Sequence, residues 1–184
     1  SIIPIRVTFS ETVTASLPGL PQSPLRLTLE TGSTDRDAFY SSGSGSTTLV
    51  LNYTVQAGDT TPDLDFVQTN SLYLIAGTVR DAAGNNANLT LPAPAGAGSL
   101  GANKNIIIDT TAPSLLSAVV LASGNAIVLT YNETLSATAP DVSRFQISDS
   151  GTSLTVTLAS TSGTELTLTT SSTIKASRVV TLSY

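Results

Sequence analysis

Apolar and polar residues alternate along short segments of this chain, and one alternating segment occurs twice. Residues 5–13 read Ile-Arg-Val-Thr-Phe-Ser-Glu-Thr-Val, and residues 127–135 read Ile-Val-Leu-Thr-Tyr-Asn-Glu-Thr-Leu. In both copies, apolar side chains at every second position predict a half-buried β-strand that delivers a glutamate to the following loop. The joint Asp-Thr-Thr-Ala-Pro at 109–113 lies between the copies. The pattern therefore predicts two tandem repeat units.

The remaining strand-like segments are short and are separated by Gly, Ser, Asn and Asp, and no segment has a convincing helical period of apolar residues. In the first unit we expect strands at 3–9, 25–30, 38–41, 48–56, 72–79, 89–91 and 105–108. In the second unit we expect strands at 115–121, 126–131, 144–148, 153–159, 165–170 and 179–184. Seven short strands with turns between them favour a β-sandwich. The expected fold class is all-β, with two tandem sandwich domains.

The joint sets the expected domain boundaries at 1–108 for the first domain, 109–113 for the linker and 114–184 for the second domain. The chain opens in mid-strand at Ser1 and stops on a strand at Tyr184. We therefore expect a fragment of a longer protein, whose second domain is incomplete and lacks its last strand. Downstream residues or a neighbouring subunit would then cover the open sheet edge.

Composition narrows the class of protein. The net charge of −5 and the pI near 4.4 disfavour binding to nucleic acid, which needs a basic face. No apolar run is long enough to span a bilayer. The chain has no cysteine, which is compatible with export because disulfides outside the cell are permitted but not required.

Acidic residues gather in the turns that we expect near the joint. Asp59, Asp63 and Asp65 share one turn, Asp109 lies in the linker, and Glu133 follows a strand of the second unit. Carboxylates that converge repel one another unless a cation is present, and calcium takes six to eight oxygen ligands. These five residues are therefore predicted to hold an interdomain calcium ion. The alternative is that they are ordinary turn residues that bond their own backbone.

A second calcium site is predicted at the other end of the first unit. Glu11 ends one strand, and Asp81 begins the turn Asp-Ala-Ala-Gly-Asn at 81–85. The alternative here is a tight turn in which Asp81 accepts hydrogen bonds from the turn itself.

No enzymatic function is expected. Histidine and cysteine are absent, which removes the commonest general base and the thiol nucleophile. Paired carboxylates hydrolyse glycosides in many enzymes, but those clefts are lined with aromatic residues, and this chain has no tryptophan.

Several segments together resemble a known class of repeat. The segments Val-Thr-Phe-Ser-Glu at 7–11, Arg-Asp-Ala-Ala-Gly-Asn at 80–85 and Ile-Asp-Thr-Thr-Ala-Pro at 108–113 look like the bacterial Ig-like, cadherin-like repeats of giant surface adhesins. The second half, with 127–133 and the ending at 180–184, resembles a related repeat called SwmB-type. The resemblance implies Ig-like sandwiches, a cell-surface location and calcium at the joints. It maps the linker ligand onto Asp109 and loop ligands onto Asp59, Asp65 and Glu133.

The expected function is a non-enzymatic, extracellular repeat module of a bacterial surface adhesin, acting as a calcium-stiffened spacer or adhesive segment. Its partners would be neighbouring repeats, identical subunits, or ligands on a cell surface or matrix. The alternative is a structural subunit of an extracellular filament, sheath or surface layer that is assembled by strand sharing. A carbohydrate-binding accessory domain is a third class, but the tyrosines lie mostly at core-like strand positions.

Overall fold

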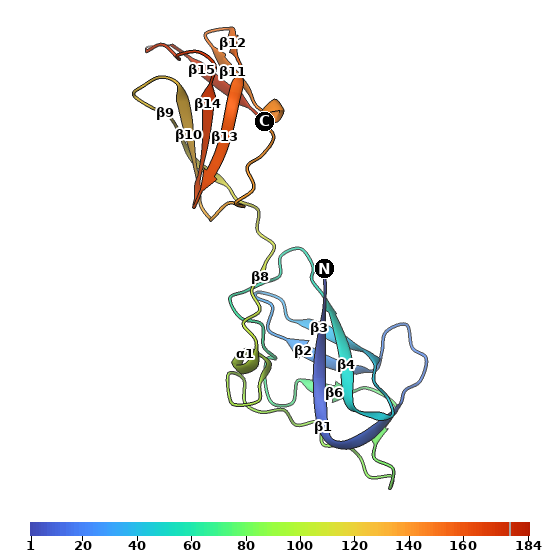
Figure 1. The fold of residues 1–184 in the computed structure, drawn as a ribbon. Helices are drawn as coiled ribbons and strands as arrows, with labels where there is room; N and C mark the ends of the chain where they lie inside the picture. The colour runs from blue at the N-terminus through green and yellow to red at the C-terminus, as the bar shows by residue number, and fades with distance from the viewer. Residues whose placement is uncertain (177) are drawn as a thin grey trace. The chain divides into compact units, whose positions relative to one another are not determined.

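The computed structural model describes residues 1–176 and 178–184, and these residues form two compact units, Ser1–Thr111 and Ala112–Tyr184 (Figure 1). Strands make up nearly all of their regular structure, with one short helix, α1 (Leu100–Asn103), and a 3-10 turn at Val142–Arg144. The all-β prediction is confirmed. No helix among the described residues is long and apolar enough to cross a membrane.

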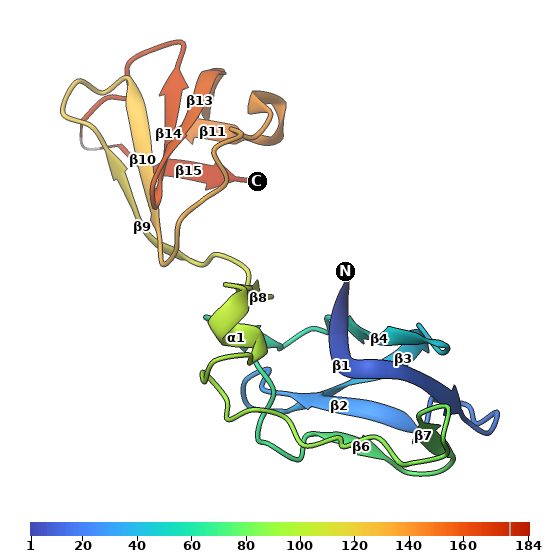
Figure 2. The ribbon, with the colours of Figure 1, turned by 60° about the horizontal axis from the view of Figure 1, so that its bottom comes forward.

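Unit 1 is built on one antiparallel sheet in the order β6-β2-β3-β4-β1-β7. The strands of unit 1 are β1 (Ile2–Ser16), β2 (Leu25–Leu29), β3 (Arg36–Ser42), β4 (Ser46–Thr54), β5 (Thr60–Thr61), β6 (Leu72–Leu74), β7 (Thr78–Arg80) and β8 (Ile108–Asp109). Strand β3 pairs with both β2 and β4, and the sheet folds over so that β1 and β4 face β2 and β6 (Figure 2). The result is a sandwich-like unit.

The core of unit 1 fills the space between these layers. Alternation along β4 buries Leu49, Leu51 and Tyr53, and the same period buries Leu27 and its neighbours on β2. Each fully buried side chain of this kind contributes about 1.5–3 kcal/mol relative to exposure. Burial of the apolar side chains that alternate along these strands is therefore the main source of this unit's stability.

Unit 2 has two antiparallel sheets, with strand orders β13-β14-β10-β9 and β12-β11-β15. Its strands are β9 (Leu115–Val120), β10 (Ala126–Tyr131), β11 (Gln146–Asp149), β12 (Thr152–Leu154), β13 (Val156–Ser162), β14 (Glu165–Thr170) and β15 (Val180–Ser183). Its core is separate from that of unit 1 and includes Ile127, Ile147 and Leu168.

The repeated sequence has a repeated structure. Ile5 on β1 pairs with Leu51 on β4, as Ile127 on β10 pairs with Leu168 on β14. Leu51 in turn pairs with Tyr40 on β3, and Leu168 pairs with Ala159 on β13. The three strands β1-β4-β3 of unit 1 therefore correspond to β10-β14-β13 of unit 2, and the β1–β4 pairing matches the β10–β14 pairing residue by residue.

Three predicted strands of unit 1 differ in the structure. The strand expected at 72–79 is split into β6 and β7 by Gly77, whose φ of 90° favours glycine and which lies against the Ser16 carbonyl. The strand expected at 105–108 is reduced to β8. No strand forms at 89–91, where Leu91 N–H donates one backbone hydrogen bond to Thr69 and no neighbouring strand completes a ladder.

Unit 2 allows a matched test of the packing. Leu168→Ala should destabilise unit 2 by about 2–4 kcal/mol because it leaves a cavity in the core. Leu158→Ala is the control, since Leu158 is 57% exposed on neighbouring β13 and its removal should cost no more than about 0.5 kcal/mol. The loss of unfolding free energy in each variant is measured by denaturant unfolding of the intact chain, with amide hydrogen exchange as the readout. Equal losses for the two variants would contradict the assigned core.

Candidate functional site

Asp59, a predicted calcium ligand, is a buried acceptor that joins three segments of unit 1. Its Oδ1 accepts a hydrogen bond from Arg36 Nε at 2.9 Å. Its Oδ2 accepts from Tyr53 Oη at 2.6 Å and from the Gln56 backbone N–H at 2.7 Å. Because the residue is only 1% exposed, its charge is balanced by these donors and not by water.

These contacts shift the pKa values of the cluster in a consistent way. Burial acting alone would raise the pKa of Asp59, but the hydrogen bonds from Tyr53 and Gln56, together with the Arg36 guanidinium, hold that pKa below its ordinary value. Burial and the hydrogen bond to Asp59 raise the pKa of Tyr53. Asp59 therefore stays ionised and Tyr53 stays protonated at neutral pH.

Asp65 holds a different segment, the loop that leads into α1. Its Oδ1 accepts from the backbone N–H groups of Phe66 at 2.9 Å and Leu100 at 3.2 Å, and its Oδ2 accepts from Ala95 N–H at 2.9 Å. Burial opposes ionisation, but the hydrogen bonds from Ala95 and Phe66 lower the pKa of Asp65. Nearby, Oδ1 of Asp63 accepts from Ile106 N–H at 3.2 Å. The carboxylates of this turn thus fasten residues 95–106 to the sandwich.

Asp109 lies where the linker leaves unit 1. It pairs with Thr60 across β5 and β8, and its Oδ1 accepts from Thr111 N–H at 2.9 Å. The side-chain hydroxyl of Thr110 donates to the Asp59 carbonyl and accepts from Gly58 N–H, both at 2.9 Å. Thr110 therefore ties the start of the linker to the same turn that contains Asp59.

The other predicted ligands have different surroundings. Glu133 is half-buried in unit 2, and its Oε1 has no hydrogen-bond partner among the described residues. Glu11 and Asp81 line one hollow of about 410 Å³ together with Asn85, Asn86 and Asn88. The structure thus brings this predicted pair to the same place. Both oxygens of Asp81, however, already accept hydrogen bonds from Asn85 at 2.7 Å.

The donors around these carboxylates decide how well they fit calcium, which requires free carboxylate or carbonyl oxygens. Asp59 does not fit, because a guanidinium and two other donors occupy both of its oxygens. Asp65 does not fit either, because three backbone N–H groups occupy it. Within residues 1–176 and 178–184, no group of three or more acidic side chains is gathered as a metal site. The calcium prediction now rests on Asp63, Asp109, Glu133 and Glu11.

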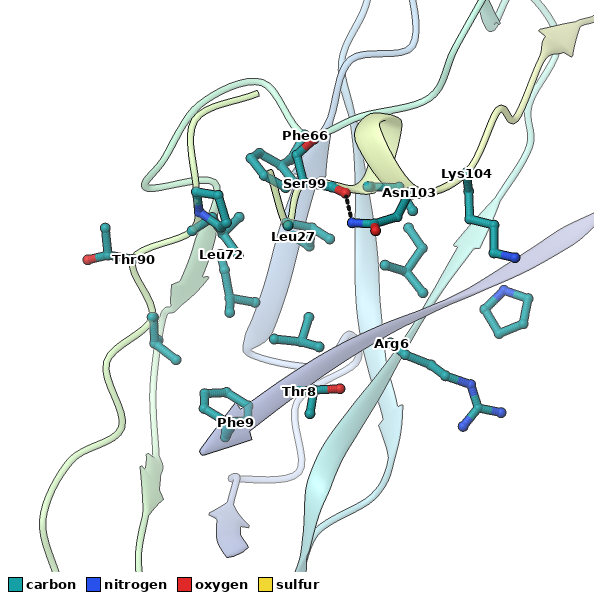
Figure 3. A pocket seen from close by; sticks show the side chains of 18 of the residues that line it. Arg6, Thr8, Phe9, Leu27, Phe66, Leu72, Thr90, Ser99, Asn103 and Lys104 are labelled. Atoms are coloured by element: carbon teal, nitrogen blue, oxygen red, sulfur yellow. Dashed lines mark hydrogen bonds between the residues drawn. The ribbon is translucent and has the colours of Figure 1, made fainter. Parts of the chain in front are cut away.

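A second feature, which the sequence did not reveal, is an apolar hollow beside β1. It has a volume of about 630 Å³, and Figure 3 shows β1 with Phe9 on one side and the segment containing Thr90 on the other. Its floor is formed by Leu27, Phe66 and Leu72 of the core. Residues 89–91 alternate between apolar and polar, so the sequence predicted a strand there. Because no strand forms, the hollow beside β1 has no covering strand.

A comparison with known protein families finds a similarity for part of the chain. The family model described as "Putative flagellar system-associated repeat" matches residues 108–184, which comprise unit 2 and the end of unit 1. No curated protein and no solved structure matches the chain. The match confirms the resemblance of the second half to a SwmB-type repeat. The likeness of the first half to cadherin-like adhesin repeats has no such support and stays a hypothesis.

Removing the Asp59 carboxylate tests whether this residue holds unit 1 together. Asp59→Ala leaves the Tyr53 hydroxyl and Arg36 without their acceptor, and should destabilise unit 1 by about 2–3 kcal/mol at pH 7. Asp35→Ala is the matched control, because Asp35 is an exposed aspartate and its loss should cost at most about 0.5 kcal/mol. Urea unfolding of both variants gives the comparison.

The same variants carry a pH signature. A carboxylate whose pKa is lowered by folding stabilises the protein above the unfolded pKa, which is about 3.9, and this stabilisation is lost as the pH falls through the folded pKa. The difference between the wild type and Asp59→Ala should therefore be constant from pH 7 to about 5 and shrink below pH 4. A difference that does not depend on pH would contradict the role of the charge.

Proposed function

We propose that this chain is a non-catalytic repeat module that acts as a spacer in an extracellular bacterial surface protein. The observation that carries the proposal is the way in which the linker is held at both of its ends. On the side of unit 1, Thr110 is the last linker residue bonded to the turn before β5, and Thr111 N–H is bonded only within the linker, to Asp109 Oδ1. Within unit 2, Ser114 N–H donates to Asn132 Oδ1 at 2.7 Å, and Asn132 N–H donates to the Ser114 carbonyl at 3.1 Å.

The free part of the linker is therefore short and conformationally restricted. Thr111, Ala112 and Pro113 lie between the two anchors. Proline fixes its own φ near −65° and restricts the preceding residue to extended conformations. A joint with so few free torsions limits the motion of one repeat relative to the next, which is the property that a spacer needs.

The stiffness proposed here comes from hydrogen bonds of the protein itself. Asp59 and Asp65 act as internal acceptors, and the Thr110 hydroxyl joins the linker to the Asp59 turn. Asp63, Asp109 and Glu133 are the remaining candidates for a calcium contribution to this stiffness. That contribution is tested by comparing the protein in calcium and in chelator.

The proposed extracellular location is supported by similarity, and the absence of cysteine is compatible with it. The match of residues 108–184 to a flagellar system-associated repeat is in keeping with an exported, tandemly repeated protein. The absence of histidine and cysteine favours a module whose role is mechanical rather than catalytic. An adhesive role within a surface adhesin would add a ligand-binding surface to the same spacer.

A second candidate is a structural subunit assembled by strand sharing. One specific observation favours it: β1 pairs with β4 on one edge, and between Ile2 and Thr8 no described strand pairs with its other edge. Such an edge is a template for another strand.

The spacer proposal can be tested with two spin labels. The chain has no cysteine, so Ser33→Cys in unit 1 and Ser160→Cys in unit 2, both at exposed positions, label it uniquely. We expect a narrow distribution of distances by double electron–electron resonance. Thr110→Ala should widen the distribution because it removes both hydrogen bonds of the Thr110 hydroxyl. Thr111→Ala should not, because the structure gives the Thr111 hydroxyl no partner among the described residues.

Calcium is the second variable in this measurement. Because Asp59 and Asp65 are already occupied by donors, we expect the same distribution in millimolar calcium and in excess chelator. A distribution that is narrow only in calcium would restore the metal hypothesis and overturn the hydrogen-bonded joint. A distribution as broad as that of a variant with three glycines inserted after Ala112 would contradict the spacer itself.

A further inference from the structure

The free edge of β1 has a defined hydrogen-bonding pattern. Val55 N–H donates to the Ser1 carbonyl at 3.0 Å, and Ile2 pairs with Thr54. In an antiparallel ladder, alternate residues direct both backbone groups to the partner strand. Odd-numbered residues such as Ile5 and Val7 therefore bond to β4, and even-numbered residues direct their backbone groups to the opposite edge.

That opposite edge has no strand partner along the first half of β1. Within residues 1–176 and 178–184, the strand that pairs with this edge of β1 is β7. Its pairing is confined to the end of β1, where Thr14 lies opposite Arg80. The backbone groups of Arg6 and Thr8 and the carbonyl of Pro4 are consequently directed away from any strand. Proline at this position is typical of an edge strand, because its missing N–H costs the β1–β4 ladder nothing.

Unit 2 shows which kind of strand occupies the corresponding edge. Strand β10 corresponds to β1, and β9 pairs with it antiparallel, with Val128 opposite Val119 and Ile127 opposite Val120. Leu121 N–H donates to the Ala126 carbonyl at 2.9 Å, so the even-numbered residues of β10 are the ones that bond to β9. These positions are equivalent to Pro4, Arg6 and Thr8.

The hollow beside β1 lies along the same edge. Residues 4–9 and 88–92 line it, and Figure 3 shows the segment with Thr90 across the hollow from β1. Val7 and Phe9 line this hollow and are only partly buried, and its floor is apolar. A strand placed on this edge in the register of β9 would direct the residues equivalent to Ala118 and Val120 to the side of the sheet on which Val7 and Ile5 lie.

We propose that the edge of β1 from Pro4 to Thr8 accepts an extended strand of the β9 type from another repeat unit, paired antiparallel and with its apolar side chains in the hollow. The partner is an uncharged polypeptide segment rich in Leu, Val and Ala, like Leu115–Val120. The bound strand would extend the order β3-β4-β1 by one strand, as β9 extends β13-β14-β10. This inference rests on the proposed repeat organisation and names the surface through which repeats join.

The test uses a synthetic peptide spanning residues 112–122, with two added lysines for solubility, and the intact chain. We expect saturable binding by fluorescence anisotropy. Amide chemical-shift changes should centre on Arg6 and Thr8. The peptide N–H equivalent to Val119 faces β1 in the proposed register, and the N–H equivalent to Ala118 faces away.

Two peptide variants exploit this difference without altering the protein. N-methylation at Val119 should weaken binding by about tenfold or more, because it removes a ladder hydrogen bond and adds a clash at the interface. N-methylation at Ala118 should change the affinity by less than about twofold, because that group faces away from β1. In the protein, Arg6→Pro should abolish binding and Arg6→Thr should retain it, with urea unfolding confirming that both variants are folded.

Three results would overturn the proposal. One is the absence of binding at millimolar peptide, and another is equal weakening by both N-methyl groups, which would indicate unspecific hydrophobic contact. The third is a set of shifts confined to β9 and β10, which would place the peptide on unit 2. If the peptide does not bind but the distribution of spin-label distances is narrow, the docking edge is wrong and the spacer function stands. If the peptide binds but the distribution of distances is broad, the docking edge stands and the spacer function is wrong.

Discussion

The backbone ladder between β1 and β4 is the interaction on which the arrangement of unit 1 depends. It pairs residues 2–8 with 48–54, and it fixes which side chains enter the core and which backbone groups face the other edge. A shift of one residue would turn Ile5 and Val7 outward and exchange the two edges. The buried positions, the hollow and the unpaired edge therefore all follow from one register, which β10 and β14 repeat in unit 2.

Asp59 and Asp65, two of the clustered carboxylates, are occupied by donors of the protein itself. Only 11% of the residues are charged, and several of the aspartates near the linker serve as acceptors for the protein's own donors. Asp59 joins β4 to the segment before β5 and to Arg36, and Asp65 holds the loop before α1. Long, mostly irregular segments such as 81–107 need acceptors of this kind, because most of their N–H groups have no ladder partner.

Much of the fold could be predicted from the alternation of apolar residues, because that alternation is what selects the buried face of a strand. The segments 5–13 and 127–135, which are similar in sequence, form strands with matching pairings in the two units. The failures at 72–79 and 89–91 have physical causes that alternation does not encode. Gly77 has a positive φ that interrupts one segment, and the other lacks a neighbouring strand.

The candidate site was harder to predict than the fold. Glu11 and Asp81 line the same hollow, but the sequence could not show that Asn85 already occupies both oxygens of Asp81. The same holds for Asp59, whose partners Arg36 and Tyr53 lie 23 and 6 residues away. A hydrophilic turn and a metal site have similar sequences, and they differ in which donors the fold brings to the oxygens.

The most direct test of the unpaired edge is residue-resolved amide hydrogen exchange along β1 in the intact chain. The alternation of the β1–β4 ladder leads us to expect slow exchange at Ile5 and Val7, whose N–H groups bond to β4, and much faster exchange at Arg6 and Thr8, whose N–H groups face the hollow. Equal protection at all four amides would contradict the account, because it would show that β1 already has a partner on both edges.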